Sequence, residues 1–457
     1  MAGSSHQEMG LLHRVSIALL LLFCSNLFLI SQRLSLKADD GRNLFSIRDV
    51  TLLCFICVSV PKVLSLSTKE WKKTSVIMTL LLAMMSVVLG VIGFLQGNER
   101  REIIFELDCV LGWLAGLCVI ALVKSKKDIQ YILFIMAFLG FLISAGVYGE
   151  VLLGIPFVSG ATGKESIITR ALVMRPTPSC WPLMSFSMVV LMAGLLGPRV
   201  SFSRKCVFGT LLAFELGAAI LTLARTLLVV AFVALIGLVF GGSRRGKRIR
   251  ANVAVAGALV LAYFLAVEVA SRYSGEIFSN ALGSRFSVFW DENARQNYAN
   301  LELRPTQLRI FLTSYGPWLL RGSPLATPLW KINPEFDIWG FSDVSVVQLG
   351  MRYGVLGLLF LFVLAWRSMT ALRAEFMPLR ENWRLSALGP ALCGLWVGGL
   401  AANFWSMTYT SFPVMALFFL RESEAFSRGS HKARLPNGYK ERHVRNIHLR
   451  VMCGQTR

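Results

Sequence analysis

The stretch Phe341-Ser-Asp-Val-Ser-Val-Val-Gln-Leu-Gly-Met-Arg-Tyr-Gly354 decides how this chain folds, because there a long polar segment turns back into an apolar one. Residues 271–344 hold thirteen aromatic residues, seven Lys or Arg and seven Asp or Glu. Apolar runs lie on both sides of this polar segment. We therefore predict a large loop between two membrane-spanning helices, and its side of the membrane sets the orientation of the whole chain.

Composition favours an integral membrane protein over a soluble one. Of the 457 residues, 55% are hydrophobic and only 16% are charged, and the mean hydropathy is +0.59. A soluble protein carries roughly 25% charged residues. The net charge of +21 lies mostly in short loops between apolar runs, as in Arg244-Arg-Gly-Lys-Arg-Ile-Arg250. This placement excludes nucleic acid as a partner and is typical of loops on the cytoplasmic side of a membrane.

The apolar runs predict an all-α polytopic membrane protein. A helix needs about 20 apolar residues to cross the roughly 30 Å hydrocarbon core. On that measure we predict about twelve spans, at 14–31, 49–66, 75–96, 103–123, 129–153, 180–197, 206–224, 226–241, 252–270, 345–366, 385–403 and 405–420.

The distribution of Lys and Arg predicts which ends face the cytoplasm. With the N-terminus inside, every strongly basic short loop falls on the cytoplasmic side, as does the tail after residue 420 with its nine Lys or Arg. The large loop then lies outside, between the ninth and tenth helices. The predicted regions are helices 1–9 in 1–270, the outer loop in 271–344, helices 10–12 in 345–420 and a basic cytoplasmic tail in 421–457.

The large loop is expected to fold into short helices over the membrane surface. Pro305 fits the first turn of a helix, and the residues after it place apolar side chains at helical spacing. Gly350, Gly354 and Gly357, just after the loop, predict close helix packing.

Charged residues within apolar helices are costly and are functional candidates by default. Arg225, at the outer end of the seventh predicted span, is the clearest of them. It has two interpretations: it pairs with a membrane acid such as Glu215, or it binds a substrate. The remaining charged residues of this kind are Glu106, Asp108, Glu150 and Glu268.

Several further arginines are predicted to face the same outer side: Arg170, Arg175, Arg304, Arg309 and Arg321. Guanidinium groups hold phosphate oxygens in bidentate fashion and keep their charge. The set therefore suits a lipid pyrophosphate, whereas contacts with lipid headgroups or salt bridges within the loop remain the alternative. The loop tryptophans, Trp318 and Trp339 among them, suit either sugar faces or the membrane interface.

The histidines narrow the choice of a general base. All five lie in the predicted cytoplasmic termini, so an outer active site needs a carboxylate instead. Asp343 stands just before the tenth predicted span and is the preferred candidate. An Asp at this place is also a common helix N-cap, and that interpretation stays open.

Three segments resemble the O-antigen ligase and polymerase superfamily. Leu221-Thr-Leu-Ala-Arg-Thr-Leu-Leu-Val-Val is similar to the family's Leu-Thr-x-Ser-Arg stretch, with Arg225 on its arginine. Phe341 to Gly357 resembles the family's segment that ends in Gly-x-x-Gly, with Gly354 and Gly357 on its glycines, and Arg309 to Gly322 resembles the helix and Pro/Gly segment before it. In place of the histidine of the ligase branch this chain has Ser342 or Asp343.

The resemblance implies a metal-independent glycosyltransferase without a cofactor, in the bacterial inner membrane and with its active site facing the periplasm. Its partners would be an undecaprenyl-pyrophosphate-linked glycan as donor, a second one as acceptor, the bilayer and other polysaccharide-assembly proteins. The missing histidine favours a polymerase of repeat units. The alternatives are an O-antigen ligase that transfers glycan to lipid A core or another acceptor, and a transporter of lipid-linked sugars. In the polymerase interpretation Arg225, Arg309 and Asp343 are catalytic, and Arg170, Arg175, Arg304, Arg321, Trp318 and Trp339 bind substrate.

Overall fold

A computed structural model describes most of the chain. The described residues are 9–30, 34–37, 43–153, 155–158, 178–197, 200–222, 225–241, 257, 299–313, 318–336, 344–375, 383–402 and 409–423.

Helices make up nearly all of the described elements. In chain order these are α1 (Leu11–Ser25), η1 (Leu27–Leu29), β1 (Ser35–Lys37), β2 (Asn43–Ser46), α3 (Ile47–Leu64), α4 (Thr68–Trp71), α5 (Thr74–Leu95), α6 (Arg100–Leu122), α7 (Lys126–Leu153), α8 (Trp181–Leu196), α9 (Phe202–Leu221), α10 (Arg225–Gly241), α14 (Ala299–Thr313), α15 (Trp318–Arg321), α16 (Leu329–Ile332), η2 (Pro334–Phe336), α17 (Ser345–Glu375), α18 (Trp383–Ser386), α19 (Leu388–Ala402) and α20 (Ser411–Glu422).

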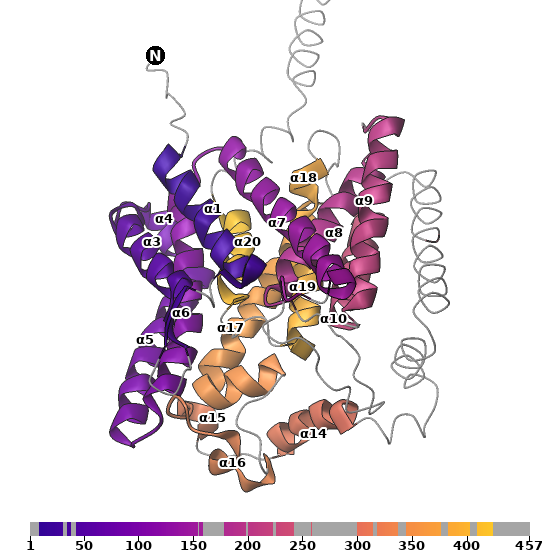
Figure 1. The fold of residues 1–457 in the computed structure, drawn as a ribbon. Coiled ribbons are helices and arrows are strands. Elements are labelled where there is room, and N and C mark those ends of the chain that lie inside the picture. Colours follow the sequence, from indigo (N-terminus) through magenta and orange to yellow (C-terminus); the bar gives the residue numbers. More distant parts are fainter. Residues whose placement is uncertain are drawn as a thin grey trace, which may run out of the picture.

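The long helices form a bundle, with α14, α15 and α16 gathered at one end and α18 and the start of α1 at the other (Figure 1). Four of the described helices are long and apolar enough to cross a membrane: α5, α6, α7 and residues 345–370 of α17. The shorter α1, α8, α10 and α19 are also apolar. These features indicate a membrane protein. Each expected apolar segment other than 252–270, of which residue 257 alone is described, overlaps a helix, whereas the number of spans stays a prediction.

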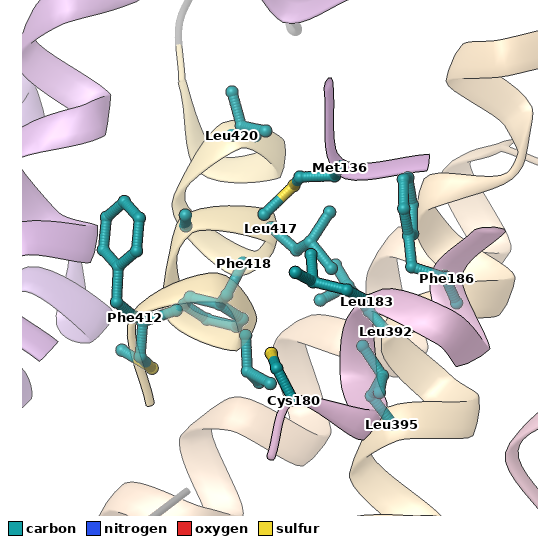
Figure 2. Close-up of a cluster of buried hydrophobic side chains, with 14 of the residues drawn as sticks. Met136, Cys180, Leu183, Phe186, Leu392, Leu395, Phe412, Leu417, Phe418 and Leu420 are labelled. Carbon is teal, nitrogen blue, oxygen red and sulfur yellow. The ribbon is translucent and has the colours of Figure 1, made fainter. Parts of the chain in front are cut away.

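The core of the bundle is built around α8 and α20. Nearly every residue of these two helices is buried. Leu417 of α20 lies near Leu183 of α8 (Figure 2), whereas Phe412 lies on the other side of α20, with its ring centroid 6.1 Å from that of Phe55 in α3. Small residues let α6 approach α20, because a β-carbon at Gly112 would overlap Ser411. The central position of these helices explains why they are apolar on every side.

Polar contacts at the α14–α16 end join segments that are expected on the outer side. Asn98, in the turn between α5 and α6, donates from its side chain to the Thr327 Oγ1 of the large loop at 2.9 Å. Asn26, after α1, donates to the Ser179 Oγ just before α8 at 3.0 Å.

Contacts at the opposite end join segments that are expected to be cytoplasmic. The Arg14 guanidinium contacts Asp128 at 2.9 Å, which links α1 to the start of α7. Arg367 of α17 contacts Glu422 of α20 at 2.6 Å. The number of spans and the orientation of the chain stay predictions.

The structure departs from the expected all-α fold in one place. Strands β1 and β2 form an antiparallel hairpin between the first two expected spans, with Leu36 opposite Phe45. The first expected span is also shorter than predicted. Helix α1 ends at Ser25, because Asn26 takes a left-handed conformation with φ of 51°.

Helix α17 covers the tenth expected span but is broken at Gly354, where φ is 56° and ψ is −141°. Close packing was expected of three glycines here, and it is found at two. A β-carbon at Gly350 would overlap the Phe311 ring, and one at Gly357 would overlap the Leu349 carbonyl. At Gly354 the backbone instead uses the conformational freedom of glycine to change direction.

The large loop contains short helices, as expected, but α14 begins before Pro305 rather than at it. Pro305 lies inside α14, which starts at Ala299. The loop also has a small hydrophobic cluster of its own. Ile310 and Phe311 of α14 pack with Leu329, Phe336 and the first turns of α17. The part of the loop that the structure describes therefore forms a packed cover over this end of the bundle, and we call this part the cover.

Candidate functional site

A buried ion pair fixes the cover to the bundle. The Arg352 guanidinium of α17 lies 2.6 Å from the Glu106 carboxylate of α6, and the two side chains are 4% and 18% exposed. Arg352 also donates to the carbonyl of Thr327 at 2.6 Å. Glu106 accepts from the backbone N–H of Ala326 at 3.0 Å. One pair therefore joins α6, α17 and residues 322–328 of the loop, which we call the strap.

The strap has its backbone polar groups satisfied by the helices beneath it. Leu325 donates its N–H to the carbonyl of Leu89 in α5 at 3.1 Å, and its own carbonyl accepts from Asn98 at 2.8 Å. Ser323 donates its N–H to the carbonyl of Arg352 at 3.1 Å. An irregular segment can be buried only when its backbone groups find such partners. The sequence of the strap is thus matched to α5, α6 and α17.

Two glycines allow the strap to approach the helices. Gly322 has a φ of 78°, and a β-carbon there would overlap the Arg352 carbonyl. A β-carbon at Gly93 of α5 would meet the Leu325 carbonyl. At position 322 glycine is needed both for the positive φ and for the lack of a β-carbon.

A second arginine lies buried on the other side of α6. Arg48, at the start of α3, forms ion pairs with Asp49 and with Asp108 of α6. Its guanidinium also lies 4.4 Å from the centroid of the Tyr409 ring, just before α20. One guanidinium faces two carboxylates here, so this cluster carries one formal negative charge.

Local sequence explains why Arg48 sits where it does. Ser46 and Asp49 form a capping box, in which Ser46 donates its N–H to the Asp49 carboxylate at 2.8 Å. The box starts α3 directly after strand β2. Arg48 in the first turn then reaches Asp108, which lies in the third turn of α6.

The other two described membrane acids are engaged separately. Glu150 of α7 accepts from the backbone N–H groups of Phe157 and Val158 at 2.8 and 2.9 Å. Glu215 of α9 is fully buried and accepts from the Ser187 Oγ of α8 at 2.6 Å. The membrane acids of the described chain thus lie in separate contacts and form no continuous chain of carboxylates.

Of the predicted site residues, Arg309 and Arg321 have described side chains. Both are exposed, on α14 and α15, and α14 packs against α17 through Phe311. Within the part of the chain that the structure describes, neither guanidinium forms an ion pair or hydrogen bond. Their charges are therefore available to an anion.

The remaining predicted residues are placed only in part. Arg225 is the first residue of α10, Arg304 lies in α14 and Trp318 is the first residue of α15. Four others, Arg170, Arg175, Trp339 and Asp343, lie outside the described residues. Helix α17 begins at Ser345, two positions after Asp343.

Arg48 and Arg352 are the polar residues that sequence reasoning missed. The signal was present, because the membrane acids Glu106 and Asp108 each required a cation. Both arginines lie in the N-terminal parts of apolar helices, α3 and α17, where an acid of α6 can reach them. Pairing each acid with such an arginine would have found them.

Comparison with known proteins adds no identification: no family model and no curated protein matches the chain. Among the described side chains, no group of three or more His, Cys, Asp or Glu residues is arranged to hold a metal ion.

Proposed function

We propose that this chain is a glycosyltransferase that polymerises polyprenyl-pyrophosphate-linked oligosaccharide repeat units at the outer face of a bacterial inner membrane. One observation carries the proposal. Arg309 and Arg321 expose guanidinium groups that form no ion pair among the described residues, on a cover that is anchored over one end of an apolar helical bundle. Such groups suit the two phosphates of a lipid-linked donor.

The position of α10 supports a role for Arg225 beside this cover. Gly394 of α19 packs against the Val230 carbonyl of α10, and Ser345 of α17 donates to the carbonyl of Gly399 in α19. In the expected topology α10 and α19 run in opposite directions. Arg225, five residues before Val230, then lies at the level of Gly399 and of the start of α17.

In this proposal Arg225 and Arg309 neutralise the pyrophosphate as it leaves, and Arg321, Arg304, Arg170 and Arg175 help to hold the lipid-linked substrates. Asp343 accepts the proton of the attacking sugar hydroxyl as the new glycosidic bond forms and the bond to the pyrophosphate breaks. Donors that are already in place for a developing charge are typically worth about 3–4 kcal/mol each. A general base adds roughly 10²–10⁴ in rate.

The transporter alternative has less support. A proton path through the membrane acids was its basis, yet Glu106, Asp108 and Glu150 each lie in a separate contact with an arginine or with backbone N–H groups. The ligase alternative uses the same donor as the polymerase and differs only in the acceptor. An experiment with both acceptors therefore has to distinguish the two activities.

Purified protein in detergent tests the proposal, because flipping has no meaning without a bilayer. The substrate is a single polyprenyl-pyrophosphate-linked repeat unit. A ladder of longer lipid-linked glycans would support the polymerase. Transfer to an added lipid A core without elongation would support the ligase, and no reaction with either acceptor would contradict both.

A further inference from the structure

Helices α5 and α6, against which the strap packs, expose apolar side chains at the level of the strap. Its Leu325 hydrogen bonds to the Leu89 carbonyl of α5, and beyond that level α5 exposes Val91, Phe94 and Leu95. The carbonyl of Leu325 and the hydroxyl of Thr327 in turn accept from Asn98, just after the end of α5. The strap therefore lies alongside the last apolar turns of α5 and reaches the polar turn that follows them.

Helix α6 gives the same depth independently. Glu106, which accepts from the N–H of Ala326 in the strap, follows Phe105, whose side chain is 55% exposed. Arg100, at the start of α6, lies with its guanidinium 5.1 Å from the centroid of the Phe94 ring. An arginine stacked at the end of an apolar helix surface marks the headgroup level. The strap thus lies nearer the hydrocarbon than Arg100 does.

The short helices on either side of the strap each expose one large apolar side chain next to a cation. On α15 Leu320 is 80% exposed and Arg321 follows it. On α16 Trp330 is 42% exposed, and the Lys331 Nζ lies 5.4 Å from the centroid of its ring. Paired apolar and cationic side chains, tryptophan in particular, are typical of the membrane interface.

From these observations we infer that residues 322–328 form a re-entrant segment, anchored to the phospholipids of the outer leaflet by Leu320 on one side and by Trp330 and Lys331 on the other. The buried pair Arg352–Glu106 then has a specific purpose. Non-helical backbone at membrane depth is tolerated only where protein groups satisfy it. Arg352, Glu106 and Asn98 supply those groups. Phospholipid is the committed partner, since the exposed cation of Lys331 suits its phosphate and the exposed apolar side chains suit its acyl chains.

Brominated phospholipids test the inference, because bromine quenches a tryptophan that it touches. The full chain is reconstituted into nanodiscs with bromine either near the headgroup end or near the methyl end of the acyl chains. Subtracting the emission of the Trp330→Phe protein from that of the unchanged protein isolates Trp330. Trp366 of α17, which is 56% exposed, provides a matched control through Trp366→Phe.

We expect Trp330 to lose about half or more of its emission to bromine near the headgroup end, and less to bromine near the methyl end. Trp366 is the last residue of the expected tenth span and lies at the opposite end of that span, so its quenching shows only that a lipid-exposed tryptophan is detected. Emission of Trp330 that neither lipid quenches, while Trp366 is quenched, would overturn the inference. If the Trp330→Phe protein cannot be purified, Trp330→Tyr takes its place in the subtraction. No lipid-linked glycan is present, so the result is independent of the proposed activity.

Discussion

The Arg352 guanidinium and the Glu106 carboxylate lie 2.6 Å apart, and both side chains also bind the backbone of residues 322–328. This pair therefore does more than neutralise two charges. It ties together two apolar helices and the polar cover that the proposal places over the active site.

Replacing Arg352 tests that relationship. Arg352→Ala leaves the partly buried Glu106 carboxylate without its cation, and breaking a fully buried pair costs about 3–5 kcal/mol, which is an upper bound here. We expect a clear drop in the apparent Tm in detergent and a smaller drop for Arg352→Lys. Arg309→Ala, which removes an exposed arginine, is the control and should leave Tm unchanged. Equal Tm values for Arg352→Ala and Arg309→Ala would show that the pair does not hold the cover.

The close approach of the strap predicts a difference between two glycines. Gly322 and Gly97 both have positive φ, of 78° and 77°. A β-carbon at Gly322 would overlap the Arg352 carbonyl, whereas one at Gly97 would meet nothing within 4 Å. Both alanine variants carry the strain of positive φ. Overpacking adds typically about 1–3 kcal/mol, so Gly322→Ala should unfold at a lower temperature than Gly97→Ala in a thermal melt. The reverse order would contradict the position of the strap.

The charge imbalance around Arg48 predicts an order of stability. Arg48→Gln leaves Asp49 and Asp108 buried without a cation, which is strongly destabilising. Asp108→Asn keeps the shape and leaves one arginine facing one carboxylate. We expect Arg48→Gln to lower the apparent Tm more than Asp108→Asn does. An equal loss in the two proteins would mean that Asp108 is needed as a charge.

Much of the helical framework could be predicted from sequence, because runs of apolar residues long enough to cross a bilayer form helices. The expected segments 75–96 and 103–123 match α5 (Thr74–Leu95) and α6 (Arg100–Leu122) closely. Helical spacing also predicted an apolar helix face after Pro305, and α14 has Ile310 and Phe311 buried on such a face.

Features that depend on contacts between distant segments could not be predicted in this way. The break at Gly354 follows from the packing of Gly350 and Gly357 against their neighbours. The pairing of Arg352 with Glu106 requires knowing that α6 and α17 are adjacent. Sequence spacing carries neither fact, although the presence of unpaired membrane acids pointed to missing cations.

Asp343 offers a direct test of the general base. Asp343→Asn keeps hydrogen-bonding capacity for a helix cap but removes the proton acceptor. We expect the rate of elongation to fall by roughly 10²–10⁴ with little change in Tm. An elongation rate equal to that of the unchanged protein would leave Asp343 with a capping role alone.

The initial rate of elongation by purified Arg225→Ala protein tests the central claim most directly. The assay uses a single polyprenyl-pyrophosphate-linked repeat unit in detergent, and gel separation gives the product lengths. Arg204→Ala, which removes an exposed arginine near the start of α9, is the matched control. We predict that Arg225→Ala elongates at a rate lower by about 10²–10³, while Arg204→Ala is unchanged. Equal rates for the two variants, with both proteins folded, would contradict the proposal that Arg225 neutralises the departing pyrophosphate.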